Sequence, residues 1–168
     1  MTDSKTYIDL MEGLKKEAVC YLRLCELGEE QKEILVAGDL SRLPENVRLS
    51  EKEVFALGPL ASSRAVAVGA IGREWGLSSP SLAVIAERVP GEVRSEFQNA
   101  VREVVEAARK LDDVNRSNEK LLENAVGYVN FTLKALSDEG RPKTVYTPES
   151  LRSLSANVQA ASTLNRVV

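Results

Sequence analysis

The stretch EAARKLDDVNRSNEKLLENAVGYVNFTLKAL, from Glu106 to Leu136, decides the fold class. Its apolar residues recur at steps of three and four, the spacing of one face of an α-helix. Asn115 and Asn118 occupy two consecutive positions of that apolar face. A polar pair in a helix–helix seam fixes register and partner orientation at some cost in stability, so we assign both asparagines a register-setting role. The alternative is that their amides hydrogen-bond a bound partner or line a water-filled groove.

This stretch belongs to a longer predicted helix, from about Glu92 to Ser137, which at 1.5 Å per residue is about 70 Å long. A helix of this length needs a packing partner along its whole length, because intrinsic propensity contributes little of its stability. The seam predicted to meet that partner consists of Phe97, Val101, Val104, Ala108, Leu111, Asn115, Asn118, Leu122, Ala125, Val129, Thr132 and Leu136.

Two further long helices are predicted upstream, over 4–37 and from about Pro44 to Trp75. The first carries a heptad seam of Tyr7, Met11, Leu14, Ala18, Tyr21 and Cys25. In the second, Gly58-Pro59 predicts a kink or break near Ala56. Beyond it, a stripe of small residues (Ala61, Ala65, Gly69 and Gly72) indicates close helix packing.

A short helix follows, with Ser79 as the expected cap and Pro80 at its first position. Its Leu82, Ile85 and Ala86 should dock on the long helices. The predicted fold class is therefore all-α: an elongated, coiled-coil-like antiparallel bundle of three long helices, with this short helix between the second and third.

The chain changes character after the last long helix. The stretch SDEGRPKTVYTP, residues 137–148, is loop-like, and the segment that follows has apolar residues at helical spacing: Leu151, Leu154, Val158, Ala161 and Leu164. Its Ser and Asn content makes its own helical tendency weak, so we expect a mobile amphipathic helix that folds when docked. We divide the chain into a helical bundle domain, 1–138, and a flexible linker with amphipathic tail, 139–168. Whether this tail docks on its own bundle is left open.

The amino-acid composition argues against a catalytic or metal-binding function. The chain has 168 residues, a net charge of −3 and no histidine, so the commonest general base and metal ligand are both missing. Cys20 and Cys25 lie roughly 140° apart around a helix, which disfavours a disulfide and favours buried, inert thiols. We therefore expect no enzymatic activity, no cofactor, no metal site and no nucleic-acid partner.

The first ten residues, MTDSKTYIDL, lack the basic head and apolar core of a signal peptide. The apolar runs are also shorter than the roughly 18 residues that span a bilayer. These patterns predict a cytoplasmic protein that does not insert into membranes.

Several stretches together resemble the FlgN family of flagellar type III export chaperones. The first, residues 29–54, contains the turn sequence VAGDLSRL between two helices. The second, residues 73–90, is similar to the family's short helix. The third has Asn-x-x-Asn followed by a Leu pair and an aromatic, matched here by Asn115, Asn118, Leu121, Leu122 and Tyr128. The motif TVYTPES follows, and the likeness covers about 7–150 in order and spacing.

The resemblance implies a cytosolic chaperone that binds the C-terminal helical region of hook-associated (hook–filament junction) proteins. Such a chaperone prevents premature assembly and delivers its client to the cytosolic platform of the export gate. By the same resemblance, Tyr146 is the candidate contact with that platform. The tail residues Leu151, Leu154, Val158, Ala161 and Leu164 are the candidate client-binding residues.

The second long helix departs from the family pattern. Its stretch LGPLASSRAVAVGAIG, residues 57–72, is apolar where the family is usually rich in charge. The packing there, and whether the chain is a monomer or a homodimer, is thus left open.

A different class of protein, a helical coiled-coil scaffold or adaptor without a role in secretion, needs the same seams. It does not need the GDL turn, the asparagine pair or the amphipathic tail, and gene neighbourhood would discriminate the two. A third reading, a small helical enzyme, needs a convergent polar cluster that the sequence does not show.

Overall fold

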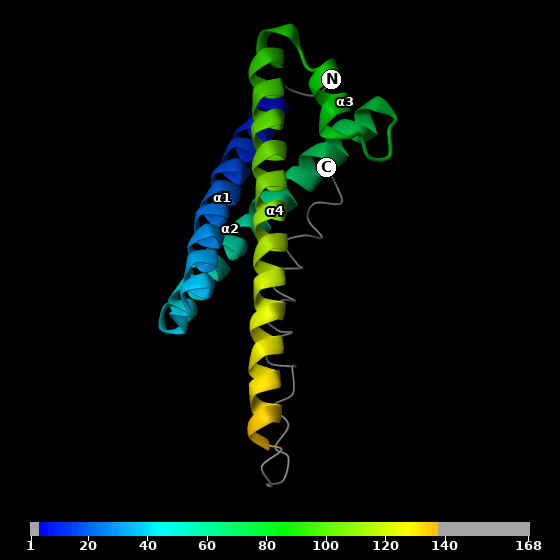
Figure 1. Cartoon of the computed structure of the whole chain (residues 1–168). Coiled ribbons are helices and arrows are strands. Elements are labelled where there is room, and N and C mark those ends of the chain that lie inside the picture. The colour runs from blue at the N-terminus through cyan, green and yellow to red at the C-terminus, as the bar shows by residue number, and fades with distance from the viewer. Residues whose placement is uncertain (1–3, 138–168) are drawn as a thin grey trace.

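A computed structural model describes residues 4–137, which are helical apart from short connections (Figure 1). The elements are α1 (Ser4–Ala37), the 3-10 helix η1 (Leu40–Arg42), α2 (Leu43–Trp75), α3 (Leu82–Arg88) and α4 (Gly91–Ser137). The predicted all-α class is confirmed for these residues, with three long helices and a short one between the second and third.

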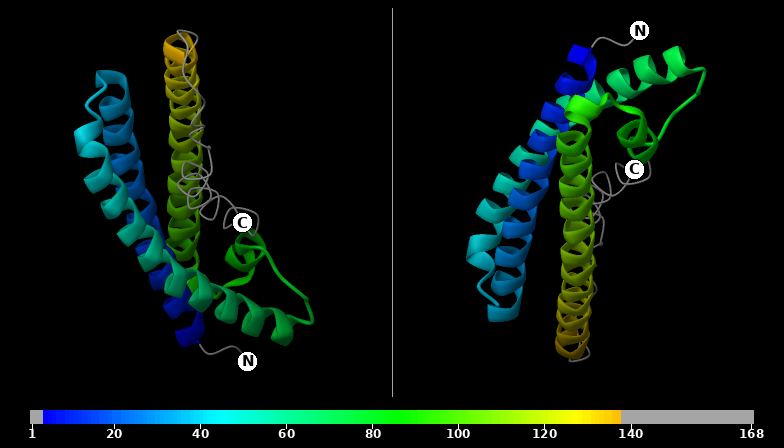
Figure 2. Two further views of the ribbon diagram at one scale, coloured as in Figure 1. Left: turned by 90° about the horizontal axis from the view of Figure 1, so that it is seen from below. Right: turned by 90° about the horizontal axis from the view of Figure 1, so that it is seen from above.

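Helices α1 and α2 run antiparallel, joined by the tight turn through η1 (Figure 2). The direction follows from their contacts, because Glu17 pairs with Arg64, whereas the later Leu27 meets the earlier Asn46. The turn is possible because Gly38 has φ +70°, a left-handed conformation that glycine adopts without a Cβ penalty.

Helices α1 and α4 run parallel. Lys15 Nζ lies 2.8 Å from Glu96 Oε1, and further along both helices Asn118 Nδ2 lies 3.0 Å from Gln31 Oε1. The α1–α4 contact is the most extensive helix pairing among the described residues.

The three long helices are arranged differently from a closed bundle. Helix α1 lies between α2 and α4, which make no extended contact with each other. The described part of the chain is therefore two helix pairs that share α1, and the closed packing of a three-helix bundle is not seen. Most of the buried side chains come from α1, from α3 with its C-cap Val89, and from α4: Tyr7, Leu10, Met11, Leu14, Ala18, Tyr21, Leu24, Cys25, Leu27, Ile34, Leu82, Ile85, Ala86, Val89, Phe97, Ala100, Val104, Ala107, Ala108, Leu111 and Val114.

Helix α2 runs unbroken from Leu43 to Trp75 with Pro59 inside it, so the predicted break does not occur. Proline removes one backbone hydrogen bond to the preceding turn. Here Pro59 lies on the exposed face, and Phe55, whose carbonyl loses its partner, is 84% exposed. Water can therefore satisfy that carbonyl, which explains why the helix continues.

The small-residue stripe of α2 does not pack on another helix, contrary to the sequence prediction. Ala65 is exposed, and a Cβ on Gly69 would meet only an arginine side chain of its own helix. Gly72 alone of the glycines in the stripe is needed for close approach, because a Cβ there would lie 2.7 Å from the Leu77 carbonyl oxygen and 2.8 Å from Pro80 Cδ. These contacts are with the α2–α3 connection.

Helix α3 docks as predicted, with Leu82, Ile85 and Ala86 buried. Its cap is Ser81, whose side chain accepts from the Val84 amide at 3.3 Å, and the prediction of Ser79 was wrong. Pro80 consequently precedes the cap. A serine two residues closer to the first buried side chain offers the same capping chemistry, so composition alone did not separate the two.

The last part of α4 extends beyond the other helices. Gln31 lies opposite Asn118, and only six residues of α1 follow before it ends at Ala37, level with residue 124 of α4 (118 + 6). Residues 123–137, here called the overhang, project past the α1–α2 turn (Figures 1 and 2). The partner predicted along the whole of α4 is therefore absent at this end among the described residues.

One helical stretch of the described chain, Leu40–Trp75, is long and apolar enough to cross a membrane by length and composition. A single stretch of this kind is weak evidence for insertion. Here the stretch packs on α1 and carries Arg64, which pairs with a carboxylate of α1.

Candidate functional site

Helices α1 and α4 approach closely around Gly28. Asn118 is 3% exposed, and its Nδ2 donates to the Gly28 carbonyl oxygen at 2.7 Å and to Gln31 Oε1 at 3.0 Å. A Cβ on Gly28 would lie 2.4 Å from Val114 Cγ1. The missing side chain thus allows Val114 to lie against the α1 backbone, where Asn118 reaches a backbone carbonyl.

The two predicted seam asparagines occupy different environments. Asn118 is buried in the interface, whereas Asn115 is half-buried and its neighbour Val114 occupies the core. A straight helix drifts relative to an exact 3.5-residue repeat, so Val114 rather than Asn115 lies against α1 at this point of the seam. That these asparagines set register stays a prediction.

Replacement of Asn118 tests that prediction. We expect Asn118→Ala to lower the unfolding free energy by about 1 kcal/mol, the net value of a typical hydrogen bond. Asn115→Ala, on the same helix and without a side-chain contact of this kind, should change it by less than half as much. Urea unfolding measures both; equal losses would contradict a special role for Asn118.

Gly28 provides a second test of this contact. Gly28→Ala should lower the unfolding free energy by about 1–3 kcal/mol, because overpacking against the stiff Val114 outweighs the helical preference for alanine. Gly13→Ala is the matched control on the same helix, since a Cβ there meets nothing within 4 Å. It should instead stabilise by about 0.5–1 kcal/mol. A stabilising Gly28→Ala would show that the interface is looser than described.

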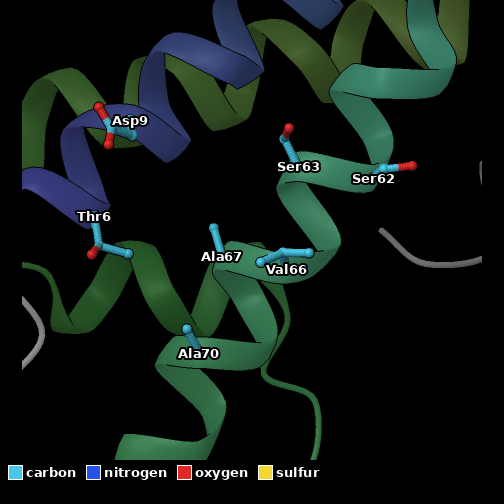
Figure 3. A pocket seen from close by; sticks show the side chains of 7 residues that line it. All are labelled: Thr6, Asp9, Ser62, Ser63, Val66, Ala67 and Ala70. Atoms are coloured by element: carbon cyan, nitrogen blue, oxygen red, sulfur yellow. The ribbon is translucent and has the colours of Figure 1, made fainter.

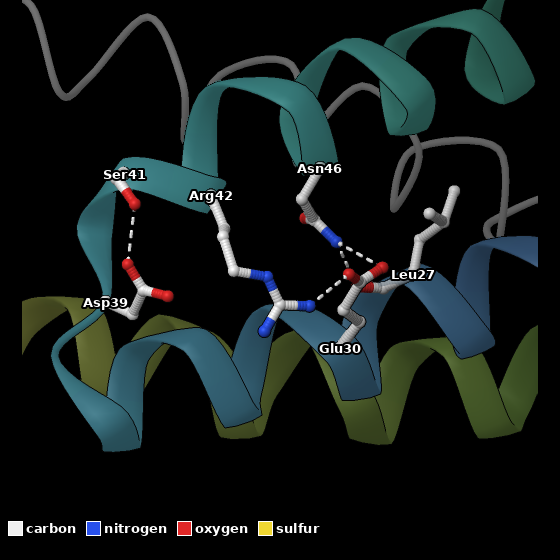
Figure 4. A network of polar contacts seen from close by, with 6 residues as sticks. All are labelled: Leu27, Glu30, Asp39, Ser41, Arg42 and Asn46. Atoms are coloured by element: carbon white, nitrogen blue, oxygen red, sulfur yellow. Dashed lines mark hydrogen bonds and ion pairs between the residues drawn. The ribbon is translucent and has the colours of Figure 1, made fainter.

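A polar network fixes the start of α2 against α1 (Figure 4). Asn46, 2% exposed, donates from Nδ2 to the Leu27 carbonyl oxygen at 2.9 Å. Arg42 Nη2 donates to Glu30 Oε1 at 2.8 Å beside it. These bonds hold the turn sequence VAGDLSRL and the start of α2 against α1. This turn sequence, which resembles that of the family, therefore has a structural role here.

A buried ion pair lies between α1 and α2. Glu17 is fully buried, Arg64 is 8% exposed, and Arg64 Nε lies 3.5 Å from Glu17 Oε1. Neither carboxylate oxygen of Glu17 has a hydrogen-bond partner. Burial raises the pKa of the Glu17 carboxyl, while the positive charge of Arg64 acts to lower it.

This pair was not among the predicted site residues, although the sequence carries a signal for it. Leu10, Glu17 and Leu24 are spaced by seven, as are Leu57, Arg64 and Ile71. In both sets one charged residue occupies the middle position of an otherwise apolar heptad series. Two opposite charges at heptad positions of adjacent helices are a pattern for a buried pair.

Two shallow open grooves flank α1. One lies between α1 and α2 and is lined by Thr6, Asp9, Ser62, Ser63, Val66, Ala67 and Ala70 (Figure 3). The other lies between α1 and α4, with Ala18, Val19, Leu22 and Ala107 among charged residues. Within residues 4–137, no group of three or more His, Cys, Asp or Glu side chains could hold a metal ion.

The cysteines are both free thiols, Cys25 buried and Cys20 half-buried. Burial raises the pKa of each thiol. A raised pKa lowers the thiolate fraction and therefore the reactivity. The expectation of a buried, inert thiol thus fits Cys25 better than Cys20.

The remaining predicted site residues lie outside the described part of the chain. These are Tyr146 and the tail residues Leu151, Leu154, Val158, Ala161 and Leu164, as well as the boundary placed at 138/139. Their roles remain predictions.

The described structure is that of an elongated helical protein whose distinctive features are helix–helix surfaces rather than a convergent polar pocket. Helical surfaces of this kind are a recurring means of binding another chain. A family model described as FlgN protein matches residues 1–153, and the chain belongs to the FlgN family. No curated protein and no solved structure matches the chain.

Membership of the FlgN family indicates the general role of the protein. FlgN proteins are flagellar export chaperones, soluble and cytosolic, that bind hook-associated proteins, and the family is not one of enzymes.

Proposed function

We propose that this protein holds the C-terminal helical region of a hook–filament junction protein unassembled in the cytoplasm and delivers it to the export gate. The observation that carries the proposal is the family match over residues 1–153, which spans the helical bundle and the start of the tail. We further propose that residues 139–168 form a separate tail, which supplies the client contact.

The physical need for such a chaperone is clear. A client terminus built for coiled-coil assembly exposes an apolar seam until it assembles, and an exposed seam promotes aggregation. An amphipathic helix can cover that seam by helix-in-groove recognition. The apolar positions Leu151, Leu154, Val158, Ala161 and Leu164 have the spacing that this mode requires.

Delivery also requires release. Ordering the tail on binding costs about 2–5 kcal/mol, and this cost offsets part of the favourable contact energy. Its affinity is thereby kept moderate, which suits a protein that hands its client to another partner.

Direct titration tests the proposal. The C-terminal helical regions of hook-associated proteins are added to the full chain in a calorimeter, with saturable binding of at least one of them expected. The same peptides with their seam residues changed to serine serve as controls. Sedimentation of the complex shows whether one chain or a homodimer binds each client. Lack of binding to every such region would contradict the proposed client class.

Contact with the export platform is assigned to Tyr146. Tyr146→Ala should leave client affinity unchanged and weaken capture by the platform protein, because a phenol ring removed from a contact loses both apolar area and a hydrogen bond. A pull-down with immobilised platform protein measures this, with Phe55→Ala, at an exposed aromatic ring of α2, as the control. Unchanged capture would refute the assignment.

A further inference from the structure

The overhang exposes an apolar surface that no described helix covers. Tyr128 is 72% exposed, Val129 53% and Phe131 71%, although α4 is a continuous helix through this region. Residues 123–137 contain only two charged side chains, Glu123 and Lys134. At 100° per residue Val129 lies on one side of α4, whereas Tyr128 and Phe131 lie farther round the helix. Exposed apolar side chains with so few charges between them mark a contact surface rather than a solvated face.

The first two long helices cannot supply the missing contact. Helix α1 ends level with residue 124 of α4, and α2 begins at the same end and runs back in the opposite direction. The partner of the overhang must therefore come from a segment or molecule beyond them.

The chain itself continues from the end of the overhang. Residues 138–147 number ten and can span about 33 Å when extended, whereas packed helices lie only about 8–10 Å apart. They are long enough to reverse the chain direction. The 21 residues from Pro148 to Val168 would form a helix about 31 Å long, and the 15 residues of the overhang are about 22 Å long.

We propose that residues 148–168 fold back on the overhang when no client is bound, with the apolar face of Leu151, Leu154 and Val158 against the side of α4 that carries Val129. Tethering favours this occupant over a second molecule, because a short flexible linker gives an effective concentration in the millimolar range. Since the same tail face is proposed to bind client, client displaces the overhang. That last step rests on the proposed function; the docking itself does not.

Hydrogen–deuterium exchange of the full chain tests the docking. Amides of residues 126–134 should exchange about tenfold faster in Leu154→Asp/Val158→Asp than in the unmodified chain, because the cover is lost. Equal rates would overturn the proposal. Protection that falls on tenfold dilution would also overturn it, because it would identify a second copy as the cover.

A substitution in the overhang separates autoinhibition from client binding. Val129→Asp should raise client affinity several-fold, because the tail no longer has an internal competitor. Phe55→Asp is the matched control: Phe55 is 84% exposed on α2 and lies outside both grooves, so its substitution should leave the affinity unchanged. Lowered affinity in Val129→Asp would assign the overhang to the client site and overturn the proposal. A failure of all clients to bind would contradict the proposed function, yet the exchange result would still decide the docking.

Discussion

Arg64→Ala is expected to lower the unfolding free energy by about 3–5 kcal/mol, the typical loss when one member of a buried ion pair is removed. The reason is that Glu17, fully buried and without hydrogen-bond partners, loses the one positive charge that the structure places beside it. The free energy of unfolding of a single domain is about 5–15 kcal/mol, so the expected loss is a large fraction of the total stability. Chemical denaturation followed by circular dichroism measures it.

Two controls show whether burial is the cause. Arg48→Ala removes an arginine from an exposed pair with Glu45 on the same helix, so it should change the unfolding free energy little. Glu17→Leu/Arg64→Leu replaces both charges by apolar groups, and its stability should match or exceed that of the unmodified chain. A double variant as unstable as Arg64→Ala would mean that the packing of the arginine stem, rather than the lone charge, explains the loss.

The same loss should depend on pH. The pKa of Glu17 is higher in the folded chain than the ordinary value of about 4.3 that applies when unfolded. The cost of its buried charge is therefore fully present above the folded pKa and is relieved as the pH falls through it. The deficit of Arg64→Ala should consequently be larger at pH 7 than near pH 4, and a deficit that grows on acidification would contradict the raised pKa.

The sequence predicted the elements well because their signals are local. Gly38 and Pro44 mark the two ends of the α1–α2 turn, because each adopts a backbone conformation that few other residues favour. Heptad spacing likewise located the α1 seam, whose members Tyr7 to Cys25 are buried.

Packing between helices was harder to predict, since it depends on which faces meet. The small-residue stripe within residues 57–72 indicated close helix packing, yet Ala65 and Val66 are exposed, because among the described helices α2 packs extensively only on α1. Similarly, the seam of α4 continues past Asn118, but periodicity carries no information on where the partner helix ends. Only the contact of Gln31 with Asn118 fixes that point.

Deletion of Pro148 to Val168 is expected to abolish measurable client binding while leaving the bundle folded. The segment carries the proposed apolar contact face, whereas the buried core of the described residues lies between Tyr7 and Asn118. Its removal therefore leaves the core side chains in place. Calorimetric titration of client into the truncated chain measures binding, and a thermal melt shows that the helices persist.

Point variants of the full chain separate the apolar face from mere length. Leu154→Ser/Val158→Ser should weaken client binding by about tenfold or more, because each buried aliphatic side chain contributes about 1.5–3 kcal/mol. Ser153→Ala/Gln159→Ala alters neighbouring positions outside that apolar spacing and should have little effect. If the truncated chain binds client with undiminished affinity, the tail is not the contact. The α1–α4 groove, with Val19 and Leu22 exposed along it, then becomes the surface to vary next.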